Sequence, residues 1–328
     1  MPQKITALTL TCLGLVAADI HATVPNVAVD IAPVHSLVSQ VMDGVGQPDL
    51  LIPASASPHE YSLRPSQAKA LSEANVVFWV SEALTPWLEK ALDNIAHSAQ
   101  KIELLELKES VTYEYREGAT FESHEHHDNE EHGSEKKHNI EEVPHKDEHQ
   151  QVHEDAHDEL DPHAWLDPQN AKIWLAQIAR ILVKSDPENA TIYAENAAKA
   201  TIKLDTLMHA TQSRINAAGK PKFIVFHDAY QYFEKRFGIS ATGSISVGDA
   251  QDPSPARIKE IQNTVDKLGV TCVFTEPQFN PGLVKNVFEG TKVSTMGVMD
   301  PLGSEIKTGS NHYFRLIESM PDSLISCQ

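Results

Sequence analysis

The sequence predicts an α/β protein of two pseudo-symmetric lobes, each built on a parallel four-stranded sheet flanked by helices, and joined by one long linker helix. Short apolar runs with strand character alternate with helical patterns, which is typical of parallel sheets. These runs fall into two sets, separated by a long helical pattern. The predicted strands are 24–29, 49–53, 75–80 and 102–107 in the first lobe, and 222–226, 239–245, 271–275 and 292–298 in the second.

The intervening segments carry helical patterns, and the longest of them predicts the linker. The shorter patterns cover 36–42, 65–73, 86–96, 229–237, 254–267 and 281–288, and a longer one covers 168–183. Asp186 followed by Pro187 is typical of a helix N-cap with proline at the first helical position. A helix of about 30 residues would be roughly 45 Å long, enough to connect two lobes. We therefore expect lobes at 24–186 and 219–328, with the linker at 187–218.

The N-terminus is typical of an export signal. Lys4 precedes an uncharged apolar run at 5–17, and small residues follow it. The run is too short to span a bilayer, and the sequence before Cys12 fits a lipid-attachment site poorly. We expect a signal peptide at 1–23, cleaved between about 18 and 24, and a soluble exported protein.

The number of cysteines is consistent with an exported protein. Once Cys12 leaves with the signal peptide, only Cys272 and Cys327 are left. In an oxidising compartment such a pair favours one disulfide. The alternative is two unpaired, buried thiols.

The charge is concentrated in one segment. The chain has a net charge of −19, and residues 122–161 hold 15 acidic residues against three lysines, together with nine of the 17 histidines. A net charge of this sign argues against nucleic acid or an anionic membrane surface as a partner. Residues 122–158 have almost no apolar periodicity, so we expect a disordered insertion in the first lobe.

Four side chains outside that segment are the candidate metal ligands. Ligands bind beyond the carboxyl ends of parallel strands, and three of the four follow predicted strands: His59, His227 and Asp300. His163 lies in the stretch "DPHAWLDP", just before the long helices. A lone histidine is usually structural, but three at such positions predict a metal site between the lobes. His35, after the first strand, is a reserve candidate.

Five stretches resemble one known family. They are "SPHEYSLRPSQAKALSEANVVFWV", "DPHAWLDPQNA", "FIVFHDAYQYFEKRFG", "TCVFTEPQF" and "MDPLG", which stand in family order. Together they resemble the metal-specific solute-binding proteins of bacterial ABC transporters, and most closely the zinc-uptake (ZnuA) type. The resemblance covers about residue 24 to the C-terminus.

The resemblance implies a ligand set. The positions that match the family's ligands are His59, His163 and His227, with Asp300 or water in the fourth place. Some zinc-type relatives offer a glutamate directly before the first histidine, but Pro58 stands there and Glu60 follows, which puts that ligand in doubt. Manganese-binding relatives typically have glutamate where this chain has His227, so the resemblance favours zinc.

The chemistry of these ligands also favours zinc. Neutral imidazoles suit zinc, and three of them with one oxygen make a tetrahedral site. The second ring nitrogen of each histidine needs a partner, and Asp161, Asp167 or Asp228 are the candidates for that role.

The implied function is periplasmic capture of Zn²⁺ and its delivery to an ABC transporter membrane permease by a monomer. The alternatives are a solute-binding protein for manganese or another transition metal, a zinc-dependent hydrolase, and a zinc buffer or adhesin that uses the histidine-rich segment. The only HExxH match, "HEDAH" at 153–157, lies within the low-complexity segment, and the chain has no nucleophile elbow, which argues against the hydrolase.

Overall fold

The computed structural model describes part of the chain, in the ranges 24–116, 118, 120–121, 160–219, 221–246, 254–279, 281–293 and 295–327. The predicted signal peptide at 1–23 and the predicted insertion at 122–158 lie outside the described residues. Among the residues that are described, no helix is long and apolar enough to cross a membrane.

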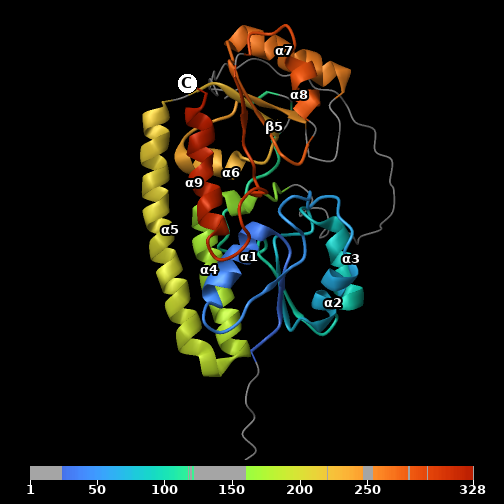
Figure 1. The fold of residues 1–328 in the computed structure, drawn as a ribbon, viewed down its shortest axis with the longest axis vertical. Coiled ribbons are helices and arrows are strands. Elements are labelled where there is room, and N and C mark those ends of the chain that lie inside the picture. Colours follow the sequence, from blue (N-terminus) through green and yellow to red (C-terminus); the bar gives the residue numbers. More distant parts are fainter. Residues whose placement is uncertain are drawn as a thin grey trace, which may run out of the picture.

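Two parallel four-stranded sheets form the framework, as predicted. The first has the order β2-β1-β3-β4 and the second the order β6-β5-β7-β8, so the two lobes share one topology. They lie at opposite ends of the long axis in Figure 1. The strands are β1 Val27–Val29, β2 Asp49–Leu50, β3 Val76–Trp79 and β4 Gln100–Glu103 in the first sheet, and β5 Phe223–His227, β6 Gly243–Ser246, β7 Cys272–Thr275 and β8 Thr295–Val298 in the second.

The predicted helices are present with small shifts at their ends. Several begin with proline, whose fixed φ and missing N–H suit the first helical turn; the starts at Pro65, Pro86 and Pro281 agree with the sequence patterns. The shorter helices are α1 Ala32–Val41, α2 Pro65–Glu73, α3 Pro86–Ile95, α6 Gln231–Phe237, α7 Pro255–Leu268, α8 Pro281–Phe288 and α9 His312–Ile325.

Helix α5 (Ala190–Ala218) runs beside both lobes (Figure 1). Its 29 residues correspond to roughly 44 Å. It packs along α4 (Pro168–Ser185) and α9, which belong to different lobes. The predicted lobe boundaries at 186 and 219 are not tested by these contacts and stay predictions.

The predicted helix start is present, with Asp186 as the N-cap and Pro187 in the first turn, but this turn is 3-10 in form. Pro187–Asn189 forms a separate 3-10 turn, and α5 begins after it. The Asp186 carboxylate accepts hydrogen bonds from the side chains of Asn189 (2.8 Å) and Tyr193 (2.9 Å), not from a helix N–H. These side-chain partners explain the difference, because they hold Asp186 inside the bend between α4 and α5.

The two lobes are also joined by buried contacts away from α5. The indole Nε1 of Trp165 donates to the carbonyl of Pro301 at 2.8 Å, and the hydroxyl of Tyr313 donates to the carbonyl of Trp165 at 2.7 Å. Helix α9 of the second lobe packs against α1 of the first. One apolar core therefore continues from lobe to lobe, which favours small relative movements over a wide opening.

A disulfide closes the second lobe, as predicted. Cys272 on β7 is bonded to Cys327, just beyond α9, and the two Cα atoms are 5.5 Å apart. This separation lies in the usual range for disulfides. The bond ties the C-terminal segment to the second sheet.

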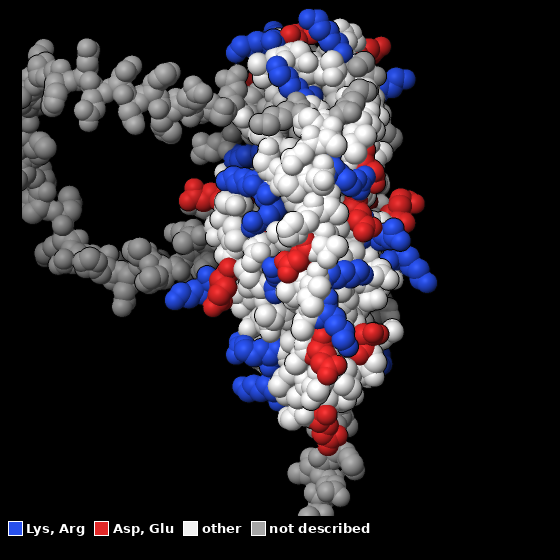
Figure 2. Space-filling view, turned by 90° about the vertical axis from the view of Figure 1, so that its left-hand side faces the viewer, with Lys and Arg blue, Asp and Glu red and all other residues white. Residues whose placement is uncertain are grey.

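The face that carries α5 has a mixed surface charge. Lys and Arg side chains alternate with Asp and Glu over the whole length of this face in Figure 2. Such interspersed charges give no extended field of one sign.

Candidate metal centre

The structure brings the three predicted histidines together at one pocket. His227 is the last residue of β5, His163 directly precedes the 3-10 helix Ala164–Leu166, and His59 lies in the loop after β2. The rings of His163 and His227 have centroids 5.2 Å apart, and those of His59 and His163 are 5.5 Å apart. The pocket is lined by Pro58, His59, His163, Trp165, His227, Glu276, Gln278, Phe279, Pro301 and Leu302.

The spacing of two ring nitrogens fits a zinc ion. The Nε2 atoms of His163 and His227 are 3.3 Å apart. Two nitrogens bound to one tetrahedral zinc, each at 2.0–2.1 Å, would be separated by about 3.3–3.4 Å. Within the described ranges, no trio of His, Cys, Asp or Glu side chains is already arranged to hold an ion. Two imidazoles thus have the spacing of neighbouring ligands, and the half-buried His59 stands beside them.

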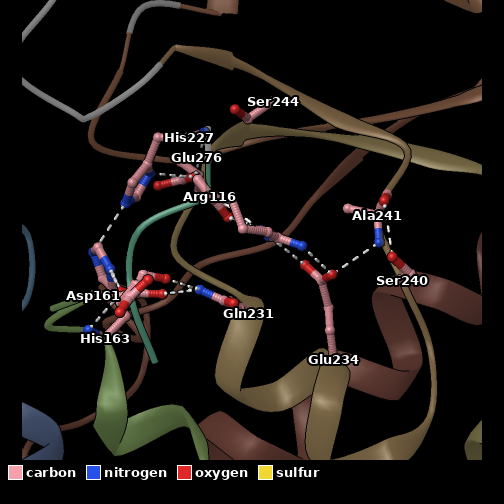
Figure 3. A network of polar contacts seen from close by, with 12 residues as sticks. Arg116, Asp161, His163, His227, Gln231, Glu234, Ser240, Ala241, Ser244 and Glu276 are labelled. Atoms are coloured by element: carbon pink, nitrogen blue, oxygen red, sulfur yellow. Dashed lines mark hydrogen bonds and ion pairs between the residues drawn. The ribbon is translucent and has the colours of Figure 1, made fainter. Parts of the chain in front are cut away.

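Asp161 orients His163. Its Oδ1 lies 2.7 Å from Nδ1 of the His163 ring and also accepts the His163 backbone N–H at 3.0 Å. Its Oδ2 accepts a hydrogen bond from Nε2 of Gln231 at 3.1 Å (Figure 3). A carboxylate at Nδ1 favours the tautomer that carries its proton there, which leaves the Nε2 lone pair directed toward the pocket. The prediction of Asp161 as this partner is confirmed.

Glu276 has the same role for His227, and the sequence analysis missed it. Its Oε1 lies 2.8 Å from Nδ1 of His227, and only 3 % of the Glu276 surface is exposed. Glu276 follows β7, which is the neighbour of β5 in the sheet. The rule that selected His227, a polar residue directly after a strand, also applies to Glu276.

Asp167 and Asp228 were predicted as histidine partners, and both predictions are wrong. Asp167 caps α4 by accepting the Gln169 N–H at 2.8 Å, and it forms a two-point ion pair with Arg236 at 2.6 and 2.7 Å. Asp228 pairs with Arg116. Each carboxylate is therefore occupied by a guanidinium, a stronger partner than a neutral ring N–H.

Arg116 connects the segment after β4 to the second lobe beside His227. Its Nε lies 2.9 Å from Asp228 Oδ2. Its Nη1 lies 2.7 Å from Glu234 Oε2 (Figure 3). Burial lowers the pKa of Arg116, but the two carboxylates outweigh this and raise it above its usual value. The guanidinium also stacks on the ring of Phe121, 3.7 Å from its centroid. This buried network fixes the residue that follows His227.

Asp300, the predicted acidic ligand, stabilises a turn. Its Oδ1 accepts hydrogen bonds from the N–H groups of Leu302 (2.9 Å) and Gly303 (3.0 Å) and from Gln278 Nε2 (3.0 Å). Its Oδ2 accepts from the backbone and the hydroxyl of Ser304, at 2.6 and 2.7 Å. Asp300 is not among the described residues that line the pocket. A direct bond from Asp300 to the ion stays a prediction, and it would require some of these five bonds to break.

The reserve candidate His35, and two other ionisable residues that the sequence places near the site or its loops, have different surroundings. His35 is buried away from the pocket, with Nε2 at 3.0 Å from the carbonyl of Pro48, and burial lowers its pKa. His312 is buried as well, with Nε2 at 2.7 Å from the carbonyl of Leu302. Glu60 is exposed. His35 and His312 therefore support loops, and Glu60 faces solvent.

The structure has two lobes of one topology, joined by a long helix. They enclose a pocket in which two of the imidazoles are held by carboxylates. These features define a two-lobed solute-binding protein. The family model described as "ZnuA: Zinc-uptake complex component A periplasmic" matches residues 27–327. The chain belongs to this family.

Individual relatives are similar over nearly their whole length. The high-affinity zinc uptake system protein ZnuA of Brucella abortus (strain 2308) is 42% identical over 321 residues, which cover 96% of this chain and 95% of that protein. The protein of the same name from Paracoccus denitrificans (strain Pd 1222) is 38% identical, with 96% and 95% covered. A crystal structure of a ZnuA deletion mutant with zinc bound has the same fold, with a TM-score of 0.70, 21% identity, and 92% and 96% covered.

Proposed function

We propose that this protein is the periplasmic zinc-binding component of a high-affinity zinc uptake system, that it captures Zn²⁺ between its lobes, and that it passes the ion to an ABC transporter permease. The observation that carries the proposal is the 3.3 Å separation of Nε2 in His163 and His227, each ring held at Nδ1 by a buried carboxylate. The names of the curated relatives support the same cargo and transport system.

The proposed ligands are His59, His163 and His227, with an oxygen ligand in the fourth place. Three neutral imidazoles favour zinc over manganese, which prefers more oxygen ligands. For the fourth place we prefer water to Asp300, because both oxygens of that carboxylate already accept hydrogen bonds. Other late transition metals would bind such a site in vitro.

Capture requires only a modest rearrangement in this proposal. His163 and His227 already have the spacing of two ligands, whereas His59 belongs to a half-buried loop of the first lobe. The ion would draw His59 and its loop toward the other two rings, and so favour the closed arrangement through its differential contacts. The shared core between the lobes supports local closure of this kind.

The proposed role is binding, not catalysis. The protein would act as an exported monomer, and residues 122–158 would raise the local zinc concentration beside the pocket. That segment lies outside the described residues, but Leu160, just after it, is only three positions before His163.

Zinc titration of the full chain and of a variant lacking 122–158 tests the proposal. We expect one tight site in both proteins, lost when His59, His163 or His227 is replaced by Ala, while His209→Ala, an exposed histidine on α5, leaves it intact. Loss of most tight binding in the deletion variant would favour a buffer or adhesin. Zinc-dependent hydrolysis of generic ester or lactam substrates would favour an enzyme.

A further inference from the structure

Gln278 lines the metal pocket and has a buried amide oxygen without a hydrogen-bond partner in the described part of the chain. It follows β7 and lines the pocket together with the three histidines. Its Nε2 donates to Asp300 Oδ1 at 3.0 Å and lies 3.5 Å from the carbonyl oxygen of Ala54. Its Oε1 is buried and has no hydrogen-bond partner among the residues that the structure describes. Buried polar atoms are nearly always paired, so this acceptor calls for a donor.

The neighbours of Gln278 fix which way its amide faces. A glutamine amide has a donor side and an acceptor side, which are assigned from the surrounding hydrogen bonds. The Asp300 carboxylate and the Ala54 carbonyl are both acceptors, so the NH₂ group must face them. The carbonyl oxygen Oε1 therefore faces away from Asp300.

The same amide links the two lobes. Ala54 belongs to the loop of the first lobe that carries His59, and Gln278 belongs to the second lobe. The amide therefore connects the loop that carries His59 to the second lobe, beside the pocket.

We propose that Oε1 of Gln278 accepts a hydrogen bond from a water molecule that fills the fourth coordination position of the bound zinc ion. This inference rests on the proposed function. A water molecule bound to zinc is a strong donor because the ion withdraws electron density from its oxygen. It supplies the donor that Oε1 requires, and it completes the tetrahedron while Asp300 keeps its turn.

An amide in this position has a chemical consequence. A zinc-bound water becomes a nucleophile when a nearby base accepts its proton, and a neutral amide oxygen cannot do so. An inorganic anion such as azide would present no donor to Oε1 through its metal-bound nitrogen, and would leave the buried acceptor unpaired. Gln278 is thus a positioning residue that favours water over anions in the fourth place.

Azide binding to the cobalt-loaded protein tests this preference, since Co²⁺ accepts the same donors and its visible absorption reports its ligands. In Gln278→Met, which keeps the length of the side chain but removes the acceptor, we expect azide to bind about tenfold more tightly than in the wild type. In Gln278→Glu, which keeps an acceptor oxygen, azide should bind no more tightly than in the wild type. Ser304→Ala is the control, because it loosens the Asp300 turn without changing the pocket lining.

The outcomes separate this inference from the function on which it rests. Equal azide affinity in the wild type and Gln278→Met would overturn the role of Gln278, while tight, histidine-dependent zinc binding would still support the proposed function. An increase of the same size in Ser304→Ala would also overturn it, because a looser turn would then explain the effect. If zinc X-ray absorption shows a wild-type site without a water ligand, the inference is wrong as well. Absence of histidine-dependent zinc binding would refute the function itself.

Discussion

His163 and His227 face each other across the pocket with Nε2 atoms 3.3 Å apart, while Asp161 and Glu276 lie 2.7 and 2.8 Å from their Nδ1 atoms. Each imidazole is thus held from behind by a carboxylate that is itself almost fully buried. The carboxylates come from different places in the fold, one just before the 3-10 helix and one at the end of β7. Both rings are therefore oriented before an ion arrives, which lowers the cost of ordering them on binding.

Removing the charge behind His227 should weaken zinc binding. In Glu276→Gln, the imidazole loses its anionic partner and its lone pair becomes less basic, so we expect zinc affinity to fall by about 10–100-fold. Asp161→Asn should have a similar effect through His163. Competition titration against a chelator of known affinity measures both. Glu318→Gln, on the exposed face of α9, is the matched control, and an equal loss there would contradict the argument.

Much of the fold follows from the sequence because it depends on local patterns. All eight strands and the helices between them were predicted, since apolar runs and proline starts are read over a few neighbouring residues. The partners of the Asp186 carboxylate were not predicted, because the hydroxyl of Tyr193 and the amide of Asn189 bind it instead of a helix N–H. Such choices between partners depend on tertiary packing.

Part of the candidate site could also be predicted from the sequence, and part of it could not. The three histidines were found from their places after strands and before a helix, and from the family resemblance. Asp161 was the correct partner for His163, but Asp167 and Asp228 were not partners, because Arg236 and Arg116 approach them from distant parts of the chain. The role of Gln278 depends on two contacts, with Asp300 and Ala54, that only the folded chain creates.

Arg116 should matter for stability. Its side chain is 16% exposed, whereas those of its partners Asp228 and Glu234 are 7% and 3% exposed. Arg116→Met would leave two buried carboxylates without their cation, so we expect unfolding free energy to fall by about 3–5 kcal/mol. Denaturant unfolding of the zinc-free protein measures this. Arg315→Met, whose exposed pair with Glu318 is worth little, should change stability by less than about 1 kcal/mol. Equal losses of unfolding free energy in Arg116→Met and Arg315→Met would contradict a stabilising role for the buried Arg116 network.

Asp30 should make stability depend on pH. It is fully buried after β1, and desolvation raises its pKa from 3.8 to about 7, although the N–H groups of Val80 and Ile31 oppose the shift. Between these two pH values the folded protein holds a proton that the unfolded chain releases. This contribution therefore favours folding at low pH and is lost as the pH rises from about 4 to about 7.

The variant Asp30→Asn isolates that contribution. Asn cannot ionise, so the difference in unfolding free energy between wild type and variant should shift in favour of the variant as the pH rises from about 5 to 8. Urea unfolding of the zinc-free proteins at several pH values measures the difference. Asp43→Asn, at an exposed position after α1, should show no such trend. A difference for Asp30→Asn that does not vary with pH would contradict the buried, protonated carboxyl.

Zinc binding should weaken as the solution becomes acidic. Imidazole coordinates metals only in its neutral form, and a histidine without special surroundings titrates near pH 6.5. Protons therefore compete with zinc at each of the three proposed ligands, and affinity should fall steeply below about pH 6. Isothermal titration with zinc from about pH 7.5 to 5 measures the trend, and uptake of protons on zinc release gives an independent reading. The variant lacking 122–158 is the necessary control, because it removes nine histidines that could also exchange protons for zinc. An affinity that stays constant in that variant would exclude three imidazoles as the ligands of the ion.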